Sequence, residues 1–96
     1  MRFEYDQHKS DSNKSKHGID FEEGKAIWDD SCALKVDLAY EKEKRYFVTG
    51  DIKGKMWTAI CTDRGVNVRI ISVRRAHKSE ERLYEESKRK RIGHNV

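Results

Sequence analysis

Residues 62–76, which read TDRGVNVRIISVRRA, combine a tight turn, an apolar run of β-branched residues and four arginines. The β-branched residues in this stretch predict a strand over residues 66–73, because such side chains favour a pleated sheet. The adjacent pair Ile70 and Ile71 must point to opposite faces, so we expect the strand to be central in its sheet and covered on both sides. The sequence Asp-Arg-Gly at residues 63–65 favours a tight turn before it.

Three further apolar segments predict strands at residues 33–38, 45–49 and 56–62. Turn residues around Gly50, Gly54 and Gly65 separate the last three strands, which are therefore expected to form an antiparallel meander. Residues 40–44 form a charged connection. Phe3 and Tyr5 alternate with polar neighbours and predict a short edge strand over residues 2–5.

Two helices are expected near the N-terminus. Asp6 is a good N-cap and Gly18 a good C-cap for the first, although residues 7–18 contain no large apolar side chain and would also fit a solvated loop. The second helix begins with a capping box at residues 20–23 and continues to about residue 29, with Phe21 and Trp28 on one face.

The last predicted helix begins near Ser79 and leads into a basic tail at about residues 88–96. Its apolar face is thin, because Leu83 and Tyr84 are nearly all that it offers to a sheet. This helix is therefore either loosely docked or completed by a partner chain. Together these elements predict one domain of the α+β class.

Composition narrows the possible functions. The chain has 96 residues, of which 35% are hydrophobic and 40% charged, and its formal net charge of +4 permits an anionic partner such as nucleic acid. No apolar run is long enough for a signal peptide or a membrane span, so we expect a cytoplasmic protein. Cys32 and Cys61 are expected to be free thiols, and no Asp, Glu or His cluster is spaced like a metal site.

Arginines inside and around the strand at residues 66–73 are the strongest functional signal. Arg69 must pair with a carboxylate, a carbonyl, water or a bound anion, and Asp37 or Glu43 could serve. Arg64 and Arg74 lie about 30 Å apart along an ideal strand, too far to hold one phosphate. Either RNA crosses the sheet and touches both, or only one belongs to the reacting site. We favour a cleft that crosses the concave face of the sheet.

Several segments resemble the BrnT-type toxins of bacterial type II toxin–antitoxin systems. They are FEYDQHKSDSN, KHGIDFEEGKAIWDD, EKRYFVTG, TDRGVNVRIISVRRA and KSEERLYEE. The resemblance implies a RelE-like fold, with a small antiparallel sheet, two N-terminal helices and one C-terminal helix, and a ribonuclease that inhibits translation. It also implies a cognate ribbon-helix-helix antitoxin, similar to BrnA, through which the complex contacts operator DNA. A homodimer or a 2:2 heterotetramer is compatible with this organisation.

Candidate site residues follow from the chemistry of RNA cleavage without a metal, which needs proton transfer and stabilisation of charge on the phosphate. The predicted catalytic residues are Lys16, His17, Arg64 and Arg74, and the predicted RNA-binding residues are Arg69, Arg75 and Tyr84. No cofactor is expected. Each residue also has a structural interpretation, since His17 can cap a helix, Arg69 can form an ion pair and Tyr84 can belong to the core. A non-catalytic basic nucleic-acid-binding module and a structural partner subunit remain the alternatives.

Overall fold

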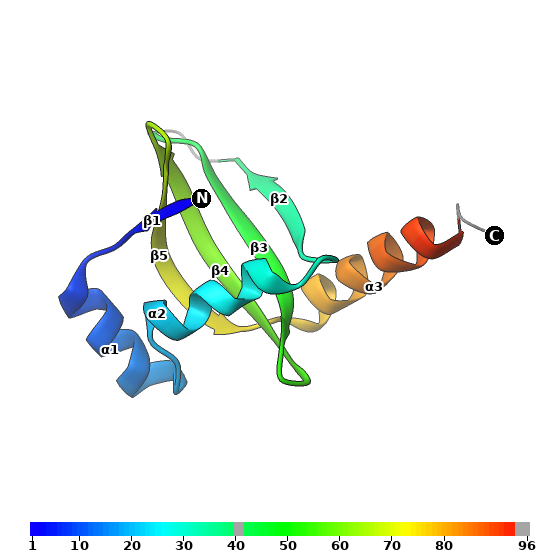
Figure 1. Cartoon of the computed structure of the whole chain (residues 1–96), viewed down its shortest axis with the longest axis horizontal. Coiled ribbons are helices and arrows are strands. Elements are labelled where there is room, and N and C mark those ends of the chain that lie inside the picture. The colour runs from blue at the N-terminus through cyan, green and yellow to red at the C-terminus, as the bar shows by residue number, and fades with distance from the viewer. Residues whose placement is uncertain (40–41, 94–96) are drawn as a thin grey trace.

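A five-stranded sheet organises the protein in the computed structural model, which describes residues 1–39 and 42–93 (Figure 1). The strands lie in the order β1-β5-β4-β3-β2. The elements in chain order are β1 (Arg2–Glu4), α1 (Gln7–His17), α2 (Phe21–Gly24), the 3₁₀ helix η1 (Lys25–Asp29), β2 (Leu34–Leu38), β3 (Arg45–Ile52), β4 (Lys55–Arg64), β5 (Asn67–Arg75) and α3 (Lys78–Gly93). The predicted α+β class is confirmed. Residues 40–41 of the charged connection and residues 94–96 of the basic tail lie outside the described residues.

The sheet is mixed, whereas the sequence predicted an antiparallel sheet. β2 to β5 form the expected antiparallel meander, with tight turns at Gly54 (φ 85°) and Gly65 (φ 59°). β1 instead pairs parallel with β5, and this places Glu4 opposite Arg69. No hairpin joins β1 to its neighbour, so alternation could predict the strand but not its direction.

A bulge in β5 alters which of its side chains are buried. The pairing with β4 shifts between Ile60 and Cys61, and Ile71 is the extra residue on β5. Ile70 and Val73 are fully buried, whereas Ile71 stays partly exposed and lines a surface pocket. β5 is an interior strand, as predicted, because it pairs with β1 on one side and β4 on the other, although β4 occupies the middle of the sheet. The prediction that both of its faces are covered is wrong, because the bulge interrupts the alternation and leaves Ile71 partly exposed.

α2 and η1 supply the apolar layer on one face of the sheet. Asp20 and Glu23 form the predicted capping box at the start of α2. Phe21 and Ile27 are buried, and the ring of Trp28 packs edge-on against the ring of Phe3. The predicted helix over residues 20–29 thus exists in two parts, an α-helical turn followed by a 3₁₀ segment.

α1 is a helix without large apolar residues, and two buried polar side chains attach it to the protein. Its predicted caps are present, since Asp6 accepts a hydrogen bond from the backbone of Lys9 and Gly18 adopts φ 79°. The amide of Asn13 donates to the carbonyls of Ile19 and Val73 at 2.7 and 2.8 Å and accepts from the Val73 N–H at 3.2 Å. The hydroxyl of Ser10 accepts from the backbone N–H of Phe21 at 2.9 Å. Hydrogen bonds thus replace the apolar stripe that normally attaches a surface helix.

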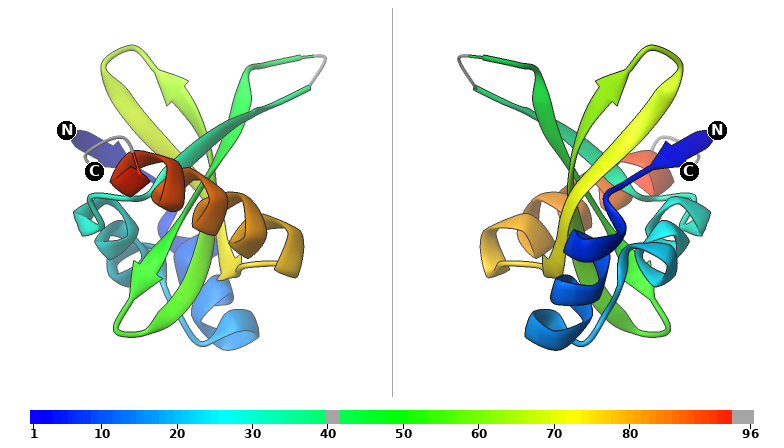
Figure 2. Two further views of the ribbon diagram at one scale, coloured as in Figure 1. Left: turned by 90° about the vertical axis from the view of Figure 1, so that its right-hand side faces the viewer. Right: turned by 90° about the vertical axis from the view of Figure 1, so that its left-hand side faces the viewer.

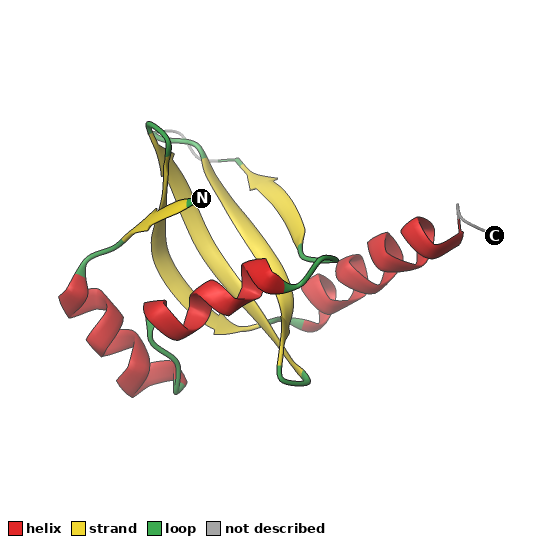
Figure 3. Ribbon diagram, in the orientation of Figure 1, coloured by secondary structure: helices red, strands yellow, loops and turns green. Residues whose placement is uncertain are grey.

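α3 lies on the face of the sheet opposite α1 and α2 and extends beyond its edge (Figures 2 and 3). Glu80 and Tyr84 are its buried residues at this interface, whereas Leu83 is 44% exposed. The thin apolar face predicted for this helix is confirmed, and polar contacts supply much of its attachment. None of the helices in the two described ranges is both long and apolar enough to cross a membrane.

Candidate anion-binding pocket

A pocket lies at one end of the sheet. There the β4–β5 hairpin diverges from the end of β3 (Figure 2). The last pair between β3 and β4 is Arg45 with Thr62, and β4 then continues through Asp63 and Arg64 paired only with β5. This divergence opens a pocket of about 960 Å³. The volume is sufficient for a phosphate-bearing ligand of nucleotide size.

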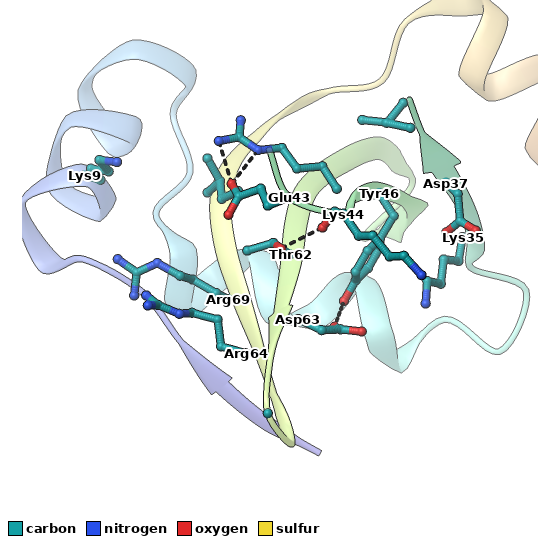
Figure 4. Close-up of a pocket in the computed structure, with 14 residues that line it drawn as sticks. Lys9, Lys35, Asp37, Glu43, Lys44, Tyr46, Thr62, Asp63, Arg64 and Arg69 are labelled. Atoms are coloured by element: carbon teal, nitrogen blue, oxygen red, sulfur yellow. Dashed lines mark hydrogen bonds and ion pairs between the residues drawn. The ribbon is translucent and has the colours of Figure 1, made fainter. Parts of the chain in front are cut away.

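Positive charge dominates the pocket (Figure 4). Its cationic side chains outnumber its carboxylates six to three. The cationic residues are Lys9, Lys35, Lys44, Arg45, Arg64 and Arg69, and the acidic residues are Asp37, Glu43 and Asp63. Clustered cations of this kind favour binding of a phosphate group.

Two predicted residues, Arg64 and Arg69, lie in this pocket. Arg69 Nη1 lies 2.9 Å from Glu4 Oε2, and Asn67 Nδ2 also donates to Glu4, at 3.3 Å. These hydrogen bonds from Asn67 and Arg69, aided by the nearby charge of Arg64, lower the pKa of the Glu4 carboxyl below its ordinary value. The sequence correctly required a partner for Arg69, but the proposed partners Asp37 and Glu43 were wrong. The parallel pairing of β1 with β5 places Glu4 directly opposite Arg69.

Arg45 is a pocket residue that the sequence analysis missed. Its guanidinium binds Glu43 Oε1 through Nε at 2.9 Å and Nη2 at 2.8 Å. The carbonyl of Lys44 accepts a hydrogen bond from Thr62 Oγ1 at 2.7 Å, which ties the start of β3 to β4. The dense charges of residues 42–45 were a detectable signal, but alone they equally fit a solvated loop.

Arg74 lies at the opposite end of β5 and is bound by α3. Its Nη1 and Nη2 donate to Glu80 Oε1 and Oε2, each at 2.8 Å, in a bidentate ion pair. Glu80 also accepts from the His77 N–H at 2.8 Å and from Thr58 Oγ1 at 3.0 Å. Burial by itself would raise the pKa of Glu80, but the bonds from Arg74, His77 and Thr58 outweigh it and lower the pKa to about 2. Glu80 is therefore ionised at neutral pH and holds Arg74 in place.

Lys16 and His17 occupy the exposed last turn of α1, toward the Arg74 end of β5. Asn13, one turn earlier in α1, binds both backbone groups of Val73, and this contact positions that end of the helix. The four predicted catalytic residues therefore do not converge. Arg64 is at one end of the sheet, and the other three are at the other end.

The remaining predicted RNA-binding residues, Arg75 and Tyr84, make structural contacts. Arg75 Nε donates to the carbonyl of Met56 at 3.2 Å, and its guanidinium lies 5.4 Å from the ring centroid of Trp57. Tyr84 is 3% exposed, and its hydroxyl donates to Asp30 Oδ2 at 2.7 Å. Burial, followed by this hydrogen bond, raises the pKa of Tyr84 well above its ordinary value. Tyr84 consequently stays protonated and anchors α3 to the turn that precedes β2.

Within the part of the chain that the structure describes, no group of three or more His, Cys, Asp or Glu residues is arranged to hold a metal ion. Cys32 and Cys61 are both free, and burial raises the pKa of the Cys61 thiol to about 12.

In a comparison with known protein families, a family model matches residues 5–80. The matching family model is described as the ribonuclease toxin, BrnT, of a type II toxin–antitoxin system. The match includes the strands that form the pocket, α1 and the first residues of α3 through Glu80. A search of curated proteins found no match.

Proposed function

Because the chain belongs to the BrnT family of ribonuclease toxins of type II toxin–antitoxin systems, we propose that it binds and cleaves RNA in the cationic pocket. The observation that carries this placement is the gathering of Arg45, Arg64 and Arg69 around one opening at the end of the sheet. Their planar guanidinium groups suit phosphate oxygens, which can accept two parallel hydrogen bonds from one arginine.

In the proposed reaction, the 2′-oxygen of one ribose attacks the adjacent phosphorus, and the bond from phosphorus to the 5′-oxygen breaks. A pocket group accepts the proton of the 2′-hydroxyl, and the departing 5′-oxygen takes up a proton. Arg64 and Arg69 stabilise the negative charge that builds up on the phosphate oxygens. Arginine can supply this stabilisation without a metal ion, so we propose metal-independent cleavage.

We assign the other predicted residues to supporting roles. Lys16 and His17 are exposed at the far end of the sheet, where they would contact the RNA strand as it leaves the pocket. Arg74 uses both terminal nitrogens in its pair with Glu80, and this pair would have to break before Arg74 could bind a phosphate, whereas Arg69 is held to Glu4 through Nη1. Arg74 therefore serves the attachment of α3.

The family also suggests how the activity is controlled. We propose that cleavage inhibits translation and that a cognate ribbon-helix-helix antitoxin, similar to BrnA, neutralises the toxin. Operator DNA would be bound only through the complex with this antitoxin, and a homodimer or a 2:2 heterotetramer is compatible with this organisation.

The direct test is incubation of the purified protein with labelled RNA in the presence and absence of a metal chelator. We expect cleavage in both conditions, and Arg64→Met should lower kcat/KM by a factor of about 100 to 1,000, typical for loss of one charge-stabilising group. Arg82→Met is the matched control, because Arg82 is exposed on α3 and does not line the pocket. Equal activity of the two variants would reject the pocket as the reaction site, and a requirement for added magnesium would reject metal independence.

A further inference from the structure

A second pocket of about 560 Å³ adjoins the cationic pocket on the face of the sheet that carries α2 and η1. Lys35, Tyr46, Asp63 and Gly65 line both pockets. The two cavities therefore meet at the point where β4 extends past the end of β3. A ligand bound in the cationic pocket can reach the second pocket without crossing the sheet.

The second pocket is less polar than the first, with apolar side chains on part of its wall and Asp30, Ser31 and Asn67 on the rest. Val48 and Val68 form part of its floor and are buried in the core. Trp28 forms one side, and its ring is supported by Phe3, with the two ring centroids 4.8 Å apart at an interplanar angle of 72°. A flat group with apolar faces suits such walls. A nucleobase has this shape, and its polar edge would have to meet the polar boundary between the pockets.

Polar and charged side chains line the boundary between the two pockets. The Tyr46 hydroxyl donates to Asp63 Oδ1 at 2.7 Å, and no described residue donates to Asp63 Oδ2. The Lys35 ammonium lies 4.2 Å from the centroid of the Tyr46 ring. The boundary thus combines a cation suited to a phosphate with a carboxylate oxygen that can only accept a hydrogen bond.

We propose that the second pocket holds one unstacked base of the RNA whose phosphates occupy the cationic pocket, and that Asp63 selects a base bearing an amino group. This inference rests on the proposed function, because it requires an RNA strand in the first pocket. A carboxylate accepts from the amino groups of cytosine or adenine, whereas the 4-oxygen of uracil is itself an acceptor and is repelled. Asp63 acts here as a specificity-determining residue.

Cytosine and uracil provide the sharpest comparison, since they have the same size and differ at one exocyclic group. RNAs that differ only in this base beside the cleaved bond should be cleaved by the wild-type protein with about a 10-fold preference for cytosine. Asp63→Asn retains an oxygen for the Tyr46 hydroxyl but replaces the other acceptor with an N–H₂ donor. We expect this variant to lose or reverse the cytosine preference while its thermal unfolding stays close to wild type.

An obstructing substitution tests the pocket independently. Val66 is 84% exposed and lines the second pocket but not the first, so Val66→Trp should fill the opening without disturbing the core. It should slow cleavage of the cytosine RNA about 10-fold, to the rate measured for RNA that lacks a base at that position. Leu83→Trp is the matched control, because Leu83 is exposed on α3 and lines neither pocket.

The possible outcomes separate this inference from the proposed function. If RNA is cleaved but Asp63→Asn keeps the wild-type preference and Val66→Trp behaves like Leu83→Trp, the base pocket is overturned and the nuclease assignment stands. If Val66→Trp abolishes binding of the antitoxin and leaves RNA cleavage intact, the pocket belongs to a protein segment and the proposal is also overturned. Absence of RNA cleavage and RNA binding by the wild-type protein would overturn both.

Discussion

Both terminal nitrogens of Arg74 donate to the two carboxylate oxygens of Glu80, each at a distance of 2.8 Å. This ion pair joins the end of β5 to the first turn of α3. Thr49 extends the network through a 2.7 Å hydrogen bond to Thr58, whose hydroxyl reaches Glu80. The attachment of α3 therefore depends on a buried polar network together with the side chain of Tyr84.

Replacement of Glu80 by Gln should destabilise the protein in a pH-dependent manner. Because the pKa of Glu80 is lowered from 4.5 to about 2, the ionised carboxylate contributes on the order of 3 kcal/mol of stability above pH 4.5. This contribution is lost as the pH falls from about 4.5 towards 2. Urea unfolding between pH 2 and 7 should therefore show a steep acid limb in the wild type and a shallower one in Glu80→Gln. Parallel limbs would contradict the assigned role.

Asn13→Ala should detach α1 from the sheet. Asn13 is 6% exposed and makes three hydrogen bonds, so its truncation leaves buried backbone groups of Ile19 and Val73 unpaired. We expect a loss of about 2 to 4 kcal/mol in the free energy of unfolding and faster amide hydrogen exchange throughout α1. Ser12→Ala, at the exposed neighbouring position, should change neither measurement. Wild-type protection of α1 in Asn13→Ala would show that other contacts hold the helix.

Gly24→Ala should destabilise the protein although alanine is the better helix former. A methyl group at position 24 would lie 2.8 Å from Val73 Cγ2, and this contact forces a side chain of the closed core to move. Overpacking of this kind costs about 1 to 3 kcal/mol and exceeds the gain in helix propensity of about 1 kcal/mol.

The same steric contact predicts non-additivity. Val73→Ala removes the obstructing methyl groups, so the double variant Gly24→Ala, Val73→Ala should be more stable than the sum of the two single changes predicts. A double-mutant cycle by chemical denaturation measures this difference. Strict additivity would indicate that residue 24 and Val73 do not meet.

His17→Gln should leave the low-pH limb of the kcat/KM profile in place, because His17 is at the opposite end of the sheet from Arg64. The described pocket offers the carboxylates of Asp37 and Glu43 as proton acceptors. The control His8→Gln changes another exposed histidine on the same helix. If the low-pH limb is lost in His17→Gln but not in His8→Gln, the reacting phosphate must bind at the end of the sheet near Arg74.

Local sequence signals predicted most of the elements correctly. Asp6, Gly18 and the capping box at residues 20–23 marked the helix ends, because a cap acts through hydrogen bonds within a few residues. Gly54 and Gly65 likewise marked turns of the meander, since turn geometry is set by the φ angles of the turn residues themselves, whereas Gly50 was wrongly predicted as a turn residue and lies within β3. The resemblance to the BrnT family, carried by segments along nearly the whole chain, was confirmed by the family match over residues 5–80.

The location of the site depended on contacts between residues far apart in the sequence. The sequence showed that Arg69 needs a partner, but only the parallel pairing of β1 with β5 made Glu4 that partner. The arginines within residues 62–76 appeared to form one group. The length of β5 separates Arg64 from Arg74, however, and α3 binds Arg74 through Glu80.

The amino-acid sequence by itself determined the helix caps, the turns, the strand segments and the family, because these depend on local backbone chemistry and on motifs within the chain. Only the tertiary structure decided the direction of β1, the bulge at Ile71 and the two adjoining pockets. These features arise where strands pair and diverge, and strand pairing is a long-range choice that local alternation does not encode. The same pairing brought Arg45 and Arg64, from separate strands, to one opening.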